Sequence, residues 1–160
     1  MNFETPQSNS GQKIEGEEKH EIDHQIYRLD VLLELAEEAI KNKLTISNEL
    51  SVELSKDIEA AKAKGINLGQ IENLDERLNV LSKLAPRAAI EGSMQHLSEN
   101  IEAGPENRLG QISWYWDSVE KLQQNENTLD IEERNRLAVQ LNELAKKIGI
   151  DNEIPPTEVS

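Results

Sequence analysis

The chain contains no cysteine, which excludes disulfide bonds, thiolate metal ligands and a cysteine nucleophile. It also lacks any run that approaches the roughly 20 consecutive apolar residues of a membrane span. The first ten residues have neither the basic start nor the apolar stretch of a signal peptide. We therefore expect a cytoplasmic protein without a membrane partner. The polar leader also leaves open export as an effector by a specialised secretion machine.

Basic residues are scarce. The 160 residues include 17 Lys and Arg against 31 Asp and Glu, and the formal net charge is −14. A surface of this charge repels phosphate backbones, and no basic patch stands out, so we expect no nucleic-acid partner. Aromatic residues make up only 3% of the chain, and the apolar 36% is mainly Leu, Ile and Ala. These residues favour helices over strands.

Apolar residues recur at steps of three and four along most of the chain, which predicts an all-α fold of about six helices. Their apolar stripes span residues 22–40, 50–61, 71–84, 90–101, 109–119 and 137–148. We expect Ser47 and Gly65 to bound the second helix, Asn67 to open the third, and Pro86 to end the third or start the next. A compact bundle is the first expectation, and stacked helical hairpins are the alternative.

The two ends of the chain differ from its middle. Residues 1–17 are polar and show no periodicity, so we expect a disordered leader. Residues 18–150 hold every predicted helix and form the expected helical domain. Residues 151–160 include two consecutive prolines and look like a flexible tail.

One short motif carries chemistry. The run from His20 to His24 reads His-Glu-Ile-Asp-His and fits H-E-x-x-H, in which two histidines one helical turn apart bind zinc. Over the eleven residues from His20 to Asp30 the sequence resembles the zincin family. The resemblance implies that His20, His24 and Asp30 would bind zinc and that Glu21 would be the general base. On helical geometry, both histidines face away from the stripe that begins at Ile22.

The sequence assembles no other catalytic or cofactor-binding motif, so we expect a non-enzymatic protein without a cofactor. Its most distinctive feature is the consecutive run of Trp114, Tyr115 and Trp116. Neighbouring helical positions lie about 100° apart, so one face cannot hold all three rings. The apolar seam of this helix is predicted to consist of Leu109, Ile112, Trp116 and Val119. Trp116 then belongs to the core, Tyr115 lies at the edge of the seam, and Trp114 points away.

Acidic charge surrounds the aromatic run. Residues 93–130 carry seven acidic and two basic residues, whereas residues 44–92 carry eight and six. The pattern favours an interaction module, such as an adaptor, an inhibitor or an immunity-type protein, that binds a basic partner protein. The expected partner-binding residues are Trp114, Tyr115, Asp117 and Lys121. Two alternatives are a zinc-dependent hydrolase that uses the motif at 20–24 and a self-assembling structural protein, a homo-oligomer joined through a second aromatic face.

Overall fold

The computed structural model describes residues 4–158, with side chains from Gly16 to Glu158. Its helices are α1 (Glu4–Lys41), α2 (Ser47–Ala63), α3 (Leu74–Ala103), α4 (Arg108–Gln124) and α5 (Ile131–Ile148), with a short 3₁₀ turn, η1 (Pro105–Asn107). No strand occurs between residues 4 and 158. The all-α prediction is confirmed, with five α-helices in place of about six. Within the described residues, no helix is both long enough and apolar enough to cross a membrane.

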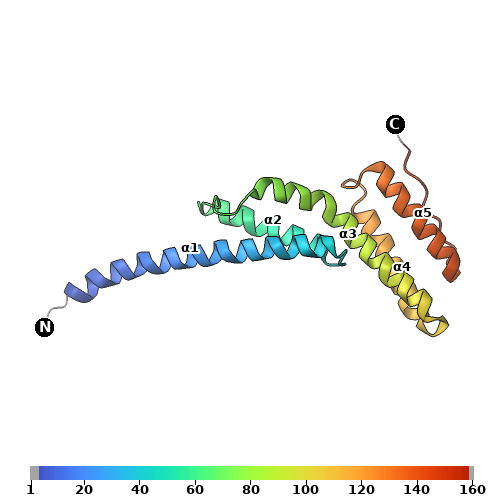
Figure 1. Cartoon of the computed structure of the whole chain (residues 1–160), viewed down its shortest axis with the longest axis horizontal. Helices are drawn as coiled ribbons and strands as arrows, with labels where there is room; N and C mark the ends of the chain where they lie inside the picture. Colours follow the sequence, from blue (N-terminus) through green and yellow to red (C-terminus); the bar gives the residue numbers. More distant parts are fainter. Residues whose placement is uncertain (1–3, 159–160) are drawn as a thin grey trace.

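The helices form two three-helix units that share α3, as Figure 1 shows. In the N-terminal unit, α1 and α2 pack on each other and on the first half of α3. In the C-terminal unit, α4 and α5 pack on each other and on its second half. Neither α1 nor α2 packs on α4 or α5. The chain is therefore elongated and has two cores, where we expected one compact bundle.

Each unit has its own apolar core. The core of the N-terminal unit follows the predicted stripe of α1 and includes Leu33, Leu54, Ile58 and Leu81, all of them fully buried. The core of the C-terminal unit joins α3, α4 and α5 through Ile90, Leu97, Leu122, Leu137 and Leu141. Leucine and isoleucine at helical spacing therefore produce both cores, as their periodicity predicts.

The third and fourth predicted helices are one helix, α3, which continues through Pro86. A proline inside a helix removes one hydrogen bond and clashes with the preceding turn, at a cost of about 3 kcal/mol. Packing on both sides offsets this cost, because Leu81 is buried in one core and Ile90 in the other. Figure 1 shows α3 changing direction along its length, and proline is a usual cause of such a bend.

The connection between α2 and α3 also differs from the prediction. Asn67 does not open a helix, because its side chain accepts a hydrogen bond of 2.9 Å from the Gly69 N–H and closes a local turn. Asn73 adopts a left-handed conformation with φ of 54° immediately before α3 begins at Leu74. Ile71, expected on a helix, is buried from within this connection instead.

The ends of the chain need one correction. The expected leader, residues 1–17, overlaps the first turns of α1, which begins at Glu4. Residues 1–3 lie outside the described part of the chain. The disorder of the leader stays a prediction. The expected flexible tail is instead attached to α5 from Ile154 to Thr157. Asn142 exchanges two hydrogen bonds with Ile154, and the buried Arg134 donates to the Pro155 carbonyl at 2.7 Å. Amide side chains on α5 thus hold a segment that forms no helix.

Candidate protein-interaction surface

The buried side of α4 is rotated away from the predicted seam. Its buried residues are Gln111, Tyr115, Ser118, Val119 and Leu122. The polar members of this set are satisfied by hydrogen bonds inside the fold. Gln111 donates from Nε2 to two carbonyl oxygens at the end of α3, both at 3.1 Å, and Ser118 donates to the Trp114 carbonyl at 2.8 Å. A helical wheel that counts only apolar residues cannot identify a buried side that includes glutamine and serine.

Tyr115 lies inside the core, not at its edge. Its side chain is fully buried, and its hydroxyl accepts a 2.9 Å hydrogen bond from Asn152 of the C-terminal segment. The phenol needs this partner, because a buried hydroxyl without a hydrogen bond is costly. Tyr115 therefore has no exposed surface with which to contact a partner, which corrects the prediction that it is a partner-binding residue.

Trp116, predicted in the core, is 46% exposed. Its ring meets Tyr115 edge to face, with ring centroids 5.0 Å apart, so the inner ring supports the outer one. Leu109 of the same predicted seam is 85% exposed, and Ile112 is half-buried. Of the four seam residues, only Val119 is buried. Three side chains of core type consequently face outward on one side of α4.

We call this surface the α4 outer face: Leu109, Ile112 and Trp116, with Glu106 before them and Glu120 after them. Steps of three and four place these five residues along one side. Both carboxylates are exposed, and neither forms an ion pair among residues 16–158. The nearby cation Arg108 is engaged elsewhere, because its guanidinium donates to the Ile148 carbonyl. The apolar stripe thus has negative charge at both ends.

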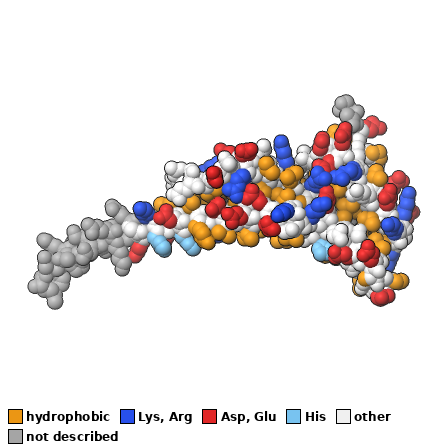
Figure 2. Space-filling model, in the orientation of Figure 1, with side chains coloured by type: hydrophobic (Ala, Val, Ile, Leu, Met, Phe, Trp, Pro, Cys, Tyr) orange, Lys and Arg blue, Asp and Glu red, His pale blue; other side chains and the backbone are white. Residues whose placement is uncertain are grey.

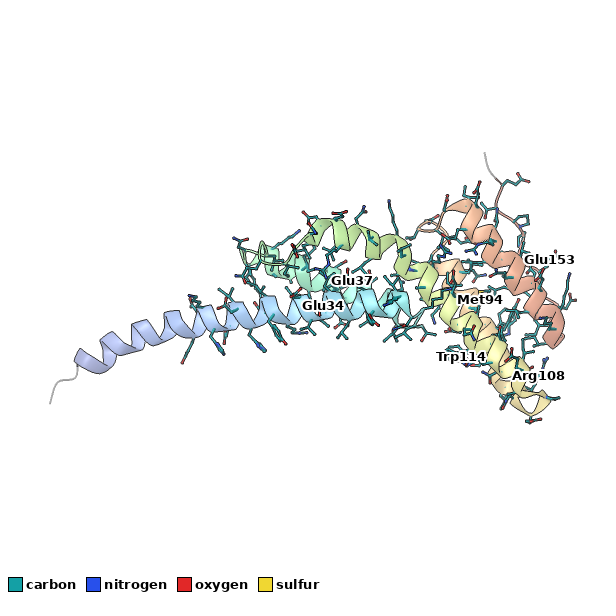
Figure 3. All side chains as sticks on the ribbon, in the orientation of Figure 1. Glu34, Glu37, Met94, Arg108, Trp114 and Glu153 are labelled. Atoms are coloured by element: carbon teal, nitrogen blue, oxygen red, sulfur yellow. The ribbon has the colours of Figure 1, made fainter. Side chains whose placement is uncertain are left out.

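Trp114 is covered within its own chain. Its indole stacks on the His96 imidazole, with ring centroids 4.5 Å apart and planes 25° apart, and it packs against the C-terminal core. Figure 3 shows Trp114 beside the second half of α3. The ring that lacked a neighbour on the helical wheel therefore has one from α3. No sequence pattern signalled this, because His96 and Trp114 are far apart in the chain.

Asp117 and Lys121 meet Ser93 of α3 in a polar contact between the two helices. The Lys121 ammonium donates to Asp117 at 2.7 Å and to the Ser93 hydroxyl at 2.8 Å, and Ser93 donates to Asp117 at 2.6 Å. Burial raises the pKa of Asp117, but the hydrogen bonds from Lys121 and Ser93 outweigh it and hold that pKa below its ordinary value. This geometry assigns the pair to helix packing, whereas their predicted role in binding a partner stays a prediction.

The histidine motif lies on the exposed first half of α1. His20, Glu21 and His24 are all exposed, beside an open groove of about 540 Å³ that also borders Lys64 and Ile66. Asp30, the third ligand that the zincin resemblance implies, is half-buried. It lies near Arg77, whose pKa is raised first by its hydrogen bond to Glu37 and further by the charge of Asp30. Within residues 16–158 no three His, Asp or Glu side chains are placed to hold a metal. The motif therefore gains no third ligand.

A charged cleft of about 620 Å³, which the sequence did not reveal, lies where the two units meet. At its centre Glu91 of α3 accepts from Lys43 at 2.9 Å and from Arg87 at 2.8 Å. Arg87 also pairs with Glu133 of α5 at 2.7 Å, as does Arg136 at 3.2 Å. These ion pairs connect the turn after α1 with α3 and α5. Because Lys43, Arg87 and Arg136 are already paired with carboxylates, the cleft is first a junction between the units.

Comparison with protein-family models, with curated proteins and with solved structures finds no match.

Proposed function

We propose that this protein is a non-enzymatic interaction module, an adaptor or inhibitor, whose α4 outer face binds a basic amphipathic segment of a partner protein. One observation carries the proposal. Leu109, Ile112 and Trp116 form an apolar stripe with the spacing of a core, yet this stripe faces outward between two carboxylates that form no ion pair with a described side chain. Exposed apolar residues that cluster in this way mark interaction sites more often than single exposed ones do.

The chemistry of the stripe specifies the partner. Tryptophan is enriched among the residues that dominate binding energy. Because the Trp116 ring already packs on Tyr115, it loses little conformational freedom when a partner covers it. Glu106 and Glu120 repel an acidic partner and attract Lys or Arg placed beyond the partner's apolar residues. A net charge of −14 speeds the approach of a basic protein by steering. A cytoplasmic location remains part of this proposal.

The proposal changes the residues that we assign to binding. Trp116 replaces the predicted Trp114 and Tyr115 as the aromatic anchor, because Trp114 stacks on His96 and Tyr115 is enclosed in the core. Asp117 and Lys121 position α4 on α3 through Ser93. Neither a homo-oligomer nor a zinc hydrolase gains a supporting observation. Two copies joined face to face would oppose their own carboxylates, and the residues from 16 to 158 give the histidine motif no third ligand.

The proposal is tested with a synthetic 18-residue Leu/Lys peptide that forms a basic amphipathic helix. Both tryptophans belong to α4, so their fluorescence reports binding at this unit. We expect the peptide to shift the wild-type emission, and Trp116→Ala and Leu109→Ala each to weaken binding by about ten-fold or more. In the Trp116→Ala protein, Trp114 remains as the reporter.

Two matched controls sharpen this experiment. Val139→Ala removes an exposed apolar side chain from α5 and should leave binding unchanged. A Leu/Glu peptide with the same apolar pattern should not bind, because it carries the wrong charge. Equal affinity of wild type and Trp116→Ala for the basic peptide would remove the α4 outer face from the proposal.

A further inference from the structure

A second stripe of residues follows the side of α1 that points away from the N-terminal core. It contains the exposed His20, His24, Tyr27 and Leu35 and the half-buried Val31, at steps of four, three, four and four. Tyr27 is 67% exposed and Leu35 is 52% exposed. In Figure 2, apolar side chains line the lower edge of α1 beside its two histidines. We call these five residues the α1 outer face.

The apolar part of this face is not a by-product of core packing. Ile26, Leu29, Leu33 and Ala36 already fill the contact of α1 with α2 and α3. On a helix, Tyr27, Val31 and Leu35 lie roughly opposite that buried stripe. A surface helix of a monomer normally has polar residues there. Helix α1 therefore has two apolar sides: one lies in the N-terminal core, and on the other Tyr27 and Leu35 are exposed among the described residues.

The first half of α1 gives a second reason to expect a partner. Every residue from Gly16 to Gln25 is exposed, so this part of the helix projects beyond the core, as Figure 1 shows. It includes Gly16, Asp23 and two histidines, which are weak helix formers. Helices in proteins gain most of their stability from packing an apolar face. A partner laid along the outer face would supply the packing that this segment lacks.

Charge identifies the occupant. Four exposed carboxylates border the α1 outer face: Glu17, Asp23, Glu34 and Glu38. The bordering cation Arg28 is directed to Asp57 of α2 at 3.8 Å, and Lys41 lies beyond the last apolar residue. A second copy of the chain would bring carboxylates opposite carboxylates, which opposes association. A helix with Lys or Arg on both sides of its apolar stripe would instead place opposite charges together.

We propose that the α1 outer face is a second docking site, which takes a basic amphipathic α-helix of another protein laid along α1. The partner helix presents apolar residues at i, i+3 or i+4 and i+7 to Tyr27, Val31 and Leu35, the usual pattern of helix recognition. The site lies on the N-terminal unit, whereas the α4 outer face lies on the C-terminal unit. The chain then binds two basic segments at once, through sites that do not depend on each other.

The test counts the binding sites with the Leu/Lys peptide, by isothermal titration with the full chain. We expect wild type to bind two peptides, and Trp116→Ala and the double variant Tyr27→Ala/Leu35→Ala to bind one each. Because Ala is the best helix former, the double variant keeps α1 intact. The control Val52→Ala/Val80→Ala removes two exposed apolar side chains from the same unit and should still bind two peptides.

Hydrogen exchange locates the site, since the peptide should slow exchange of the amides between Tyr27 and Leu35 even in the Trp116→Ala protein. Glu34→Lys/Glu38→Lys should weaken this protection at least about ten-fold. If the Tyr27→Ala/Leu35→Ala protein still bound two peptides, the α1 site would be overturned. If wild type were a dimer that Leu35→Ala dissociated, the face would bind a second copy of the chain instead. A wild type that binds one peptide, with binding unchanged by Trp116→Ala and abolished by Tyr27→Ala/Leu35→Ala, would reject the α4 site and leave the α1 site standing.

Discussion

Tyr115 and Trp116 are neighbours in the chain, yet one is enclosed and the other half-exposed. The difference follows from what surrounds each ring. Tyr115 has a hydrogen-bond donor from Asn152 within reach of its hydroxyl and apolar residues of three helices around its ring. Trp116 has Tyr115 on one side and solvent on the other. Two adjacent aromatic residues therefore serve different purposes, one in folding and one at the surface.

This difference predicts the stability of three variants. Tyr115→Phe should lower the free energy of unfolding by about 1 kcal/mol, because the Asn152 amide loses its acceptor. Tyr115→Ala should cost about 3–5 kcal/mol through the cavity it leaves, and Trp116→Ala about 1 kcal/mol through the lost edge contact. Urea unfolding measures all three. A larger cost for Trp116→Ala than for Tyr115→Ala would show that Trp116 belongs to the core after all.

Sequence reasoning placed apolar residues well where apolarity alone decides burial, as along α1, where Leu33 and Ala36 are fully buried. It was wrong along α4, where Gln111 and Ser118 occupy buried positions and Trp116 does not. Those polar side chains are stable inside because carbonyl oxygens of α3 and α4 accept their hydrogen bonds. Such partners come from the folded arrangement, and a hydrophobic pattern cannot anticipate them. The candidate binding face is visible in the sequence as an apolar stripe, which its spacing predicts to face the core.

At the scale of elements, local signals fixed some helix ends and tertiary packing fixed others. Gly65 closes α2, as the sequence predicts, and Gly149 closes α5, each with a positive φ. Pro86 does not end its helix, because both halves of α3 are anchored in a core. The turn after α1 then packs directly on α3, where Gly92 leaves room for it. The backbone of this turn approaches closely enough that a side chain would not fit.

Gly92 therefore permits the contact between the turn after α1 and the middle of α3. A Cβ at this position would overlap the Lys43 carbonyl oxygen and lie 3.0 Å from the Thr45 nitrogen. Gly92→Ala should destabilise the protein by at least about 1 kcal/mol, although Ala favours a helix over Gly by a similar amount. Gly110→Ala, whose Cβ meets only the movable Asn100 side chain, is the control and should cost less. Thermal unfolding compares them, and equal melting temperatures would contradict the close approach.

At the scale of the whole molecule, two cores are joined by one helix and one network of ion pairs. Apart from packing on α3, side chains connect the units mainly through Glu91, which accepts from Lys43 of the N-terminal unit and lies 3.8 Å from Arg136 of the C-terminal unit. The separation explains why each unit can present an uncovered apolar face of its own. Because the two cores are separate, the ion pairs around Glu91 help to fix the position of one unit relative to the other.

The ionisation of Glu91 makes this junction sensitive to pH. Burial raises its pKa, but hydrogen bonds and charge from Arg87 and Lys43 outweigh burial and hold the pKa below its ordinary value. Since its unfolded value is about 4.3, the ionised Glu91 stabilises the fold above that pH. The stabilisation is lost as the pH falls through the lower folded-state pKa.

Glu91→Gln should therefore lower the free energy of unfolding by about 1–3 kcal/mol at pH 7, since charge-assisted hydrogen bonds become neutral ones. The difference in the free energy of unfolding between wild type and variant should narrow as the pH falls from about 5 towards 3. Urea unfolding at both ends of this range measures it. Glu143→Gln, at an exposed residue that lines the same cleft without an ion pair among the described side chains, should change little at either pH. If Glu91→Gln lowered the free energy of unfolding by the same amount at every pH, packing rather than charge would hold the two units together.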